Sequence, residues 1–205
     1  MKTRIYLYTR FERFWHWGQA LLIIFLLVTG FEMHGTFKLL GYNEAYAWHV
    51  WAGWALLGLS AFAIFWHFTT GQWRHYLPGS SDLKKIIRHY LSGIFQGEPH
   101  PFCKSPEHKL NPLQAWSYLF LKLILLPGLL ASGGALLYYR SLVELGVLRS
   151  LSGLALWHTA LAFAMIIFLL VHIYMATTGE TVTQYLTAMV TGWEESERSV
   201  VGGEN

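Results

Sequence analysis

Charged residues are scarce in this chain of 205 residues. Asp, Glu, Lys and Arg make up only 13% of the sequence, whereas a soluble domain usually has about 25%. The one cysteine, Cys103, excludes an internal disulfide, a cluster held by several cysteines and the C-x-x-C-H motif that attaches c-type haem. The sequence also lacks a nucleotide-binding motif. These absences argue against a soluble enzyme with its own iron–sulfur or nucleotide chemistry.

Apolar residues make up 54% of the chain and form four long runs. Each run is long enough for a membrane-spanning helix, which needs about 20 residues. The runs cover Phe11–Met33, Ala45–Phe68, Leu113–Tyr139 and Leu151–Ala176. We therefore predict one all-α integral membrane domain over residues 1–205, a four-helix transmembrane bundle in contact with lipid. No small-residue cleavage pattern follows the first run, so we expect it to be a span and not a removed signal sequence.

Lysine and arginine are distributed unevenly around these runs. Eleven lie at the N-terminus, in the loop 69–112 or in the tail 177–205, whereas the two other connections contain Lys38, Arg140 and Arg149. The positive-inside rule therefore predicts that both termini and the long loop are cytoplasmic. The net charge of +3 reflects this bias and does not indicate nucleic-acid binding.

The long loop and the tail contain weaker helical patterns. Ser80-Ser81-Asp82 offers an N-cap, and apolar residues then recur at helical spacing from Leu83 to Ile94, which predicts a short interfacial helix. We expect Thr181–Gly192 to form a second one, followed by a disordered acidic tail. Four prolines interrupt the chain before the third run: Pro99, Pro101, Pro106 and Pro112.

Two histidines lie 14 residues apart in the last apolar run. At about 100° and 1.5 Å per residue, His172 returns to nearly the same helix face as His158, about 21 Å along the axis. This displacement is close to the separation of the two leaflets of a hydrocarbon core roughly 30 Å thick. Ionisable side chains at such depth are usually functional, and neutral imidazole is a common axial ligand of haem iron. The spacing therefore predicts two stacked, noncovalently bound haems b.

Two haems need four imidazoles at two depths. His16, at the cytoplasmic start of the first run, is level with His172, and His49, at the outer start of the second run, is level with His158. We predict that His16 and His172 bind the inner iron and that His49 and His158 bind the outer iron. The residue four positions later is small in each case, which leaves room for a flat macrocycle: Ala20, Gly53, Ala162 and Ala176.

Other interpretations stay open for several histidines. A buried histidine can also serve as an interhelical hydrogen-bond donor. His67 lies 18 residues after His49 on the same helix face, and it is an alternative to His16 as the inner ligand, or a contact of a haem propionate or a quinone. Cys103 and its nearest histidines form too irregular a set for a zinc site. The remaining histidines are expected to be solvated: His34, His75, His89, His100 and His108.

The chain resembles a known family over nearly its whole length, from the motif Arg10–Trp17 to Thr191-Gly192-Trp193. The specific elements are the first-run histidine, the second-run histidine followed by Gly53, and the histidine pair 14 residues apart. The family is that of the dihaem cytochrome b subunits of respiratory complexes. It includes formate dehydrogenase gamma subunits, nickel–iron hydrogenase b-type cytochromes and thiosulfate reductase cytochrome b subunits. The segment Gly71–Pro78 and the loop around His100-Pro101 are most similar to the thiosulfate-reductase-like branch.

The resemblance implies the inner membrane of a bacterial or archaeal cell as the location. It also implies the same four haem ligands that the depth argument predicts: His16, His49, His158 and His172. The segment Lys109–Gln114 is similar to the family's K-x-N-x-x-Q motif, in which the asparagine lies at the menaquinone pocket. A site for menaquinone or ubiquinone near Asn111 and Gln114 is therefore implied. Alternatively, Asn111 is only the N-cap of the third span, because it directly precedes Pro112.

Lys122 is an unusual residue because it lies about nine positions inside the third apolar run. Its ammonium either reaches to the interface along the flexible side chain or pairs with a buried carboxylate. A propionate of the inner haem is a candidate partner.

These features predict an electron-transfer subunit of a respiratory oxidoreductase complex. Electrons would cross between a quinone near the cytoplasmic face and an outer-side redox partner, such as a multihaem cytochrome c, an iron–sulfur protein, or a molybdoenzyme or hydrogenase module. The subunit alone would not catalyse the final substrate reaction. A metal- or proton-translocating protein would be expected to have acidic residues within its spans, which contain almost none. A structural membrane anchor would need no imidazoles at matched depths.

Overall fold

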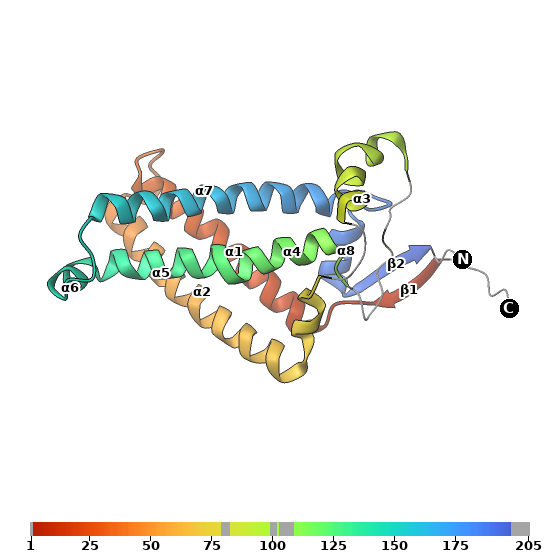
Figure 1. Cartoon of the computed structure of the whole chain (residues 1–205), viewed down its shortest axis with the longest axis horizontal. Coiled ribbons are helices and arrows are strands. Elements are labelled where there is room, and N and C mark those ends of the chain that lie inside the picture. Colours follow the sequence, from red (N-terminus) through yellow and green to blue (C-terminus); the bar gives the residue numbers. More distant parts are fainter. Residues whose placement is uncertain (1, 79–82, 99–101, 103–108, 198–205) are drawn as a thin grey trace. The chain divides into compact units, whose positions relative to one another are not determined.

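The computed structural model of the chain describes residues 2–78, 83–98, 102 and 109–197. The described part of the chain is mostly helical, and four of its helical segments are long and apolar enough to cross a membrane (Figure 1). Three spans are the single helices α1 (Arg10–Met33), α2 (Tyr42–Thr70) and α7 (Leu151–Ala176). The other span runs through α4 (Pro112–Phe120), the π-helical segment η4 (Leu121–Leu125) and α5 (Leu126–Leu137).

Shorter elements connect or follow these spans (Figure 1). They are the strand β1 (Lys2–Tyr6), the 3-10 helix η1 (Gln72–Tyr76), α3 (Leu83–Arg88), the π-helical segment η2 (His89–Gly93), the 3-10 turn η3 (Ile94–Gln96), α6 (Tyr139–Glu144), α8 (Gln184–Thr191) and the strand β2 (Trp193–Glu197). The four predicted spans are thus confirmed as helices. Their ends differ from the expected ones by at most three residues, since α2 already begins at Tyr42.

The chain divides into two compact units. The first, here called the helical unit, comprises Trp15–Arg74 and Trp116–Leu169, and the second, the terminal unit, comprises Met1–Phe14, His75–Ala115 and Leu170–Asn205. The core of the helical unit consists of aliphatic side chains and a methionine: Ile23, Leu56, Leu121, Leu125, Leu126, Leu161 and Met165. Large apolar side chains such as Trp51, Leu123 and Leu156 are about 70% exposed, as lipid-facing residues of a membrane protein would be.

The third span contains a π-helical segment directly before a proline. Pro127 has no backbone N–H, so the α-helical hydrogen bond to the carbonyl four residues earlier cannot form. The widened turn Leu121–Leu125 lies at this point, and such π-turns are frequent at functional sites. Lys122 is part of this turn.

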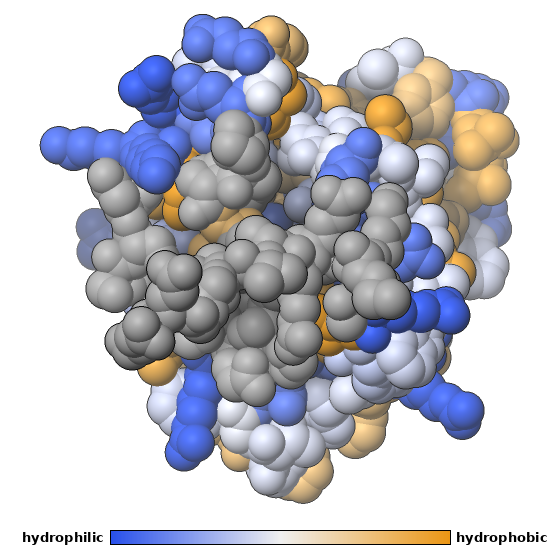
Figure 2. Space-filling view, turned by 90° about the vertical axis from the view of Figure 1, so that its right-hand side faces the viewer, coloured by the Kyte–Doolittle hydropathy of each residue, from blue (hydrophilic) through white to orange (hydrophobic). Residues whose placement is uncertain are grey.

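The terminal unit joins the two ends of the chain. β1 pairs with β2 in an antiparallel sheet with Tyr6 opposite Trp193, and the rings of these two residues lie 5.0 Å apart. The prediction of a disordered tail after Gly192 is therefore wrong for Trp193–Glu197, which form a strand. Figure 2 shows the face of the molecule that carries this sheet, and hydrophilic side chains are prominent on it.

Both short helices predicted outside the spans are present in the terminal unit. The first comprises α3, η2 and η3, which together cover Leu83–Gln96, and its Ile86 and Tyr90 pack against Met175 of α7. The second is α8, which is shorter than the predicted Thr181–Gly192. The predicted N-cap Ser80-Ser81-Asp82 lies outside the described residues, as do Pro99, Pro101, Pro106, His100, Cys103 and His108. The expectation that His89 is solvated is wrong, because its side chain is only 4% exposed beside Tyr90.

Candidate functional site

The structure brings together His49 of α2 and His158 of α7 within the helical unit. Their ring centroids are 6.3 Å apart, and the ring planes make an angle of 73°. Both side chains are half-buried. These are the two residues that sequence analysis assigned to one outer cofactor.

A hydroxyl group fixes the orientation and tautomer of His49. The Nδ1 atom of His49 lies 2.9 Å from Oγ1 of Thr29, a residue of α1 with no exposed surface. The single hydroxyl hydrogen of Thr29 is directed to the backbone carbonyls of Phe25 and Leu26, 2.9 and 3.2 Å away. The Thr29 oxygen must therefore accept a hydrogen from Nδ1 of His49. In neutral imidazole this leaves a lone pair on Nε2.

His158 is held in the same way by the third span. Its Nδ1 atom lies 2.8 Å from Oγ of Ser132, which donates its own hydrogen to the carbonyl of Gly128 at 2.6 Å. Ser132 is buried. Nδ1 of His158 therefore carries the hydrogen, and Nε2 keeps a lone pair. Metal-ligating histidines usually donate their second ring N–H to a neighbouring oxygen in this manner.

A glycine next to each hydroxyl residue gives the imidazole its space. A Cβ atom placed on Gly30 would lie 3.4 Å from Cε1 of His49. A Cβ atom on Gly133 would lie 3.2 Å from Cε1 of His158, which is closer than most side-chain contacts. Each imidazole ring thus has its own hydroxyl acceptor and an adjacent glycine that leaves it space. The two pairs are Thr29-Gly30 and Ser132-Gly133.

Two cavities adjoin this histidine pair. The larger has a volume of about 620 Å³ and the smaller about 370 Å³, and both are lined by His49 and His158. Volumes of this order are typical of sites for cofactors and other small molecules. Gly53 and Ala162, predicted to leave room for a macrocycle, line the larger cavity.

The donor set and its spacing fit a haem iron. Metal–imidazole bonds of about 2.0–2.1 Å, with each nitrogen about 1 Å from its ring centre, would place two axial ring centroids about 6 Å apart. The observed centroid distance is 6.3 Å. Among the described residues, no group of three or more His, Cys, Asp or Glu side chains could hold a metal ion. Two imidazoles therefore suit an iron whose equatorial ligands come from a macrocycle.

The residues predicted for the inner cofactor belong to both units. His16 and His67 lie in the helical unit, and His172 lies in the part of α7 that belongs to the terminal unit. His67 is buried, and its Nδ1 atom donates to the carbonyl of Ala63 at 2.6 Å, while Trp15 packs edge-on against its ring. His16 and His172 are half-buried.

Lys122 has a half-buried side chain that contacts an aromatic ring. Its Nζ atom lies 4.7 Å from the centre of the Trp15 ring, a cation–π contact within the helical unit. The Trp15 ring also contacts His67, with 5.3 Å between ring centroids. The three residues form a cluster with an intramembrane positive charge.

Asn111 and Gln114 form the N-terminal capping box of α4. Oδ1 of Asn111 accepts from the backbone N–H of Gln114 at 2.9 Å, and Oε1 of Gln114 accepts from the backbone N–H of Asn111 at 3.1 Å. Nδ2 of Asn111 donates to the hydroxyl of Tyr90 at 3.0 Å, and Asn111 is almost fully buried. Burial also raises the pKa of Tyr90. The capping role considered for Asn111 is thus present in the structure.

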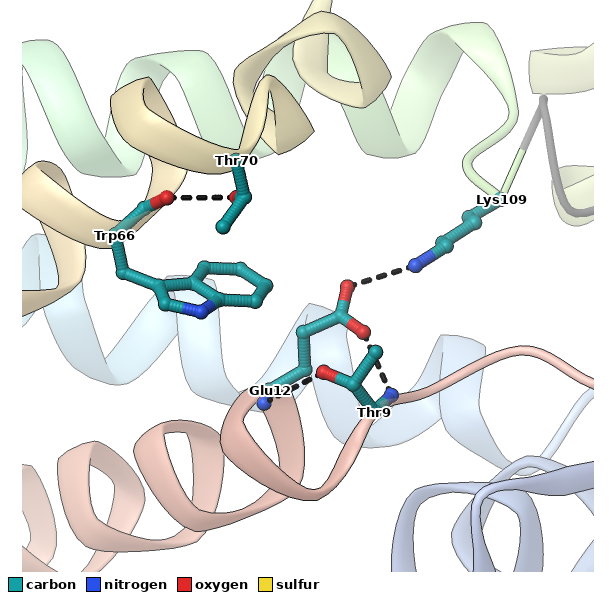
Figure 3. Close-up of polar contacts among 5 residues, drawn as sticks. All are labelled: Thr9, Glu12, Trp66, Thr70 and Lys109. Atoms are coloured by element: carbon teal, nitrogen blue, oxygen red, sulfur yellow. Dashed lines mark hydrogen bonds and ion pairs between the residues drawn. The ribbon is translucent and has the colours of Figure 1, made fainter.

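Lys109 links this segment to the start of α1. Its Nζ atom lies 2.8 Å from Oε1 of Glu12, and both side chains are largely buried (Figure 3). Glu12 also forms a capping box with Thr9, whose backbone N–H donates to Oε2 of Glu12 at 2.7 Å. Figure 3 also shows the hydroxyl of Thr70, which donates to the carbonyl of Trp66 near the end of α2. The K-x-N-x-x-Q segment therefore has a structural role within the terminal unit.

Comparison with known proteins identifies the family. A family model described as prokaryotic cytochrome b561 matches residues 7–192. The chain belongs to this family. It is 33% identical over 201 residues to the protein named "Putative cytochrome YdhU" of Escherichia coli (strain K12), an alignment that covers 93% of this chain and 74% of the relative. No solved structure matches the chain.

Membership of the prokaryotic cytochrome b561 family settles the broad class. The chain is a multi-pass membrane cytochrome of the b type, with haem b as its cofactor and electron transfer as its activity. This result favours the electron-transfer prediction over a metal- or proton-translocating protein and over a structural anchor. It agrees with the two outer imidazoles, whose Nε2 lone pairs suit haem iron.

Sequence reasoning missed the residues that hold these cytochrome imidazoles. Neither Thr29 nor Ser132 was singled out. The available signal was the repeated hydroxyl–glycine dipeptide, Thr29-Gly30 and Ser132-Gly133, in two otherwise apolar runs. Serine and threonine often bond to their own helix backbone, so the dipeptide alone does not reveal a histidine partner.

Proposed function

We propose that this cytochrome is the dihaem membrane subunit of a respiratory oxidoreductase complex. It carries electrons across the membrane between a quinone near the cytoplasmic face and a redox partner on the outer side. The observation that carries the proposal is the facing pair His49 and His158, each with its Nδ1 hydrogen donated to a buried hydroxyl. A haem b held there supplies a one-electron carrier when it is bound.

The helical unit contributes to this site in three ways. Thr29 and Ser132 hold the two imidazoles in one tautomer, so that both Nε2 atoms have a lone pair for iron. Gly30 and Gly133 let the rings lie close to the helix backbones. The apolar walls of the cavities exclude water, which favours a noncovalently bound macrocycle.

The second haem of the proposal uses the other histidine of α7. His172 follows His158 by 14 residues on one continuous α-helix, which corresponds to about 21 Å along the axis. We assign His16 as its partner, with His67 as the alternative. His67 is buried and donates Nδ1–H to a backbone carbonyl, an arrangement that also occurs in iron-ligating histidines.

The quinone site belongs to the cytoplasmic side in this proposal. We place menaquinone or ubiquinone near the inner haem, with Asn111, Gln114 and His67 as the neighbouring polar residues. The contact between Lys122 and Trp15 supports a site for a negatively charged group, such as a propionate of the inner haem. The asymmetric distribution of Lys and Arg supports the cytoplasmic assignment of both termini and the inner-membrane location.

The outer partner would be a separate redox subunit that contacts the short outer connections. It could be a multihaem cytochrome c, an iron–sulfur protein, or a molybdoenzyme or hydrogenase module, because the chain itself has one cysteine and no nucleotide motif. The final substrate reaction would belong to that partner or to a further subunit.

Haem content of purified variants tests the proposal. Pyridine haemochrome analysis of the wild-type protein should give two haems b per chain. Changing His158 to Ala should remove one haem and leave one, and His172→Ala should remove the other, because each substitution deletes one axial ligand. His75→Ala, outside both predicted pairs, serves as the control and should retain two.

The inner partner is tested in the same series. Loss of one haem in His16→Ala, with both retained in His67→Ala, would support the His16 assignment, and the reverse would transfer the role to His67. A wild-type stoichiometry of one haem, or full haem content in His158→Ala, would overturn the dihaem proposal.

A further inference from the structure

The smaller of the two cavities has a polar rim that the iron ligands do not use. Besides His49 and His158, the cavity of about 370 Å³ is lined by His34, Tyr42, Tyr46 and Thr159. His34 follows the end of α1, and the two tyrosines belong to the first turns of α2. All of these residues lie in the helical unit.

We propose that this rim binds the propionate carboxylates of the haem held by His49 and His158. This inference rests on the proposed function, because it requires a haem between His49 and His158. Haem b has two carboxylates on one edge, and the rest of its periphery is apolar. Burying a carboxylate among aliphatic side chains is costly, so this edge turns toward hydrogen-bond donors.

The rim offers donors of the required kind. The hydroxyl groups of Tyr42 and Tyr46 each have one O–H, and the imidazole of His34 has one or two N–H groups. Nε2 of His34 lies 3.3 Å from Oγ1 of Thr159, so α7 helps to position the His34 ring.

The larger cavity is a poorer place for the carboxylates. Its lining is mainly aliphatic, and Ser60 donates its hydroxyl hydrogen to the carbonyl of Leu56 at 2.7 Å. Lys122 lines the same cavity, and its ammonium lies over the Trp15 ring, with 4.7 Å between Nζ and the ring centre.

The segment that carries His34 is held in place by a buried carboxylate. Oε1 of Glu32 accepts hydrogen bonds from the backbone N–H groups of Leu39, Leu40 and Gly41 at 2.6–2.7 Å. These bonds fold residues 33–41 back onto the end of α1, so that His34 and the start of α2 lie on the same cavity. The N-terminal end of α2 adds a positive electrostatic potential, which favours anions.

The consequence concerns electron exchange with the outer partner. With its carboxylates at this rim, the haem would direct its polar edge toward the connection between α1 and α2. A docking redox subunit would then approach the haem there and not along the apolar lining of the larger cavity.

Haem with and without free carboxylates tests the inference. The full-length His172→Ala variant, expected to hold only the outer haem, is reconstituted with haem b or with its dimethyl ester, and dissociation is followed by transfer to apomyoglobin. Loss of hydrogen bonds to a charged group should make the ester dissociate about tenfold to 100-fold faster than haem b. His34→Ala and the double variant Tyr42→Phe, Tyr46→Phe should each reduce this ratio. Ser60→Ala, in the larger cavity, should leave it unchanged.

Two outcomes contradict different claims. Equal dissociation of haem b and its ester from the unmodified rim, or an unchanged ratio in both rim variants, would overturn the propionate site while haem binding stands. Absence of any haem between His49 and His158 in the His172→Ala protein would instead refute the proposed function. Resonance Raman bands of the propionate groups give a further readout, and they should shift in His34→Ala but not in Ser60→Ala.

Discussion

At the outer histidine pair, two hydroxyl groups determine which ring nitrogen carries the hydrogen. Thr29 and Ser132 each donate to their own helix backbone and must therefore accept from the imidazole. A neutral hydroxyl is a weaker acceptor than the carboxylates that often support metal-bound histidines, so it gives the imidazole less electron density. The two imidazoles are thus held by neutral groups, without a charge inside the membrane, where charge is costly.

Changing Thr29 to Val tests this hydroxyl function. The substitution keeps the shape of the side chain and removes the hydroxyl oxygen that accepts from Nδ1–H of His49. Loss of such a supporting bond typically lowers metal affinity about 10- to 100-fold, so the outer haem should dissociate faster by about this factor. A less basic imidazole also stabilises ferric iron less, and the midpoint potential of the outer haem should rise in a redox titration.

The matched controls are Thr29→Ser and Ser60→Ala. The first keeps a hydroxyl at the same position and should behave like the wild-type protein. The second removes a hydroxyl that donates to the carbonyl of Leu56 in its own helix, and it should change neither quantity. Wild-type affinity and potential in Thr29→Val would show that the threonine bonds only to its own helix.

At the scale of single elements, the sequence predicted what depends on local spacing. The four spans follow from runs of apolar residues, and the 14-residue interval places His158 and His172 on one α-helix, as observed. The bond between Ser132 and His158 could not be predicted, because it depends on the rotation of two helices about their axes. The strand β2 was missed for a similar reason. Its Glu194 and Glu195 disfavour strands locally, and the strand forms only by pairing with residues almost 200 positions earlier.

At the start of α4, a helix-capping role and a quinone-binding role of Asn111 predict different results for substitutions. Asn111 caps the helix, and our proposal also places it near the quinone. Asn111→Leu removes both the cap and the carboxamide. Asn111→Asp keeps a capping oxygen, removes the N–H donor to Tyr90 and introduces a carboxylate. If the carboxamide takes part in the quinone site, both variants should slow reduction of the inner haem by a quinol analogue about five- to 150-fold.

Stopped-flow spectroscopy of the inner haem measures this effect, with haem content checked in each variant. Both haems should stay bound, and electron exchange with an outer-side redox protein should be unchanged. Slow kinetics in Asn111→Leu together with wild-type kinetics in Asn111→Asp would show that the residue acts only as a cap. The quinone would then have to be placed near His67 and Lys122.

At the scale of the whole molecule, both the two-stranded sheet and the distribution of Lys and Arg bear on the membrane topology. Because β1 and β2 pair within the terminal unit, the N-terminal and C-terminal segments must lie on one side of the membrane, as an even number of spans also requires. The sheet alone does not say which side. Lysine and arginine supply that information, since eleven of the 15 lie in the termini and the long loop.

A reporter fused after Asn205 tests this topology. Green fluorescent protein at this position should fluoresce and alkaline phosphatase should be inactive, because the first folds in the cytoplasm and the second requires export. An alkaline phosphatase insertion after Gly146, in the connection between α6 and α7, should be active and serves as the matched control. Active phosphatase after Asn205 would reverse the orientation. The site of His49 and His158 would then face the cytoplasm, and the quinone site would move to the opposite membrane surface.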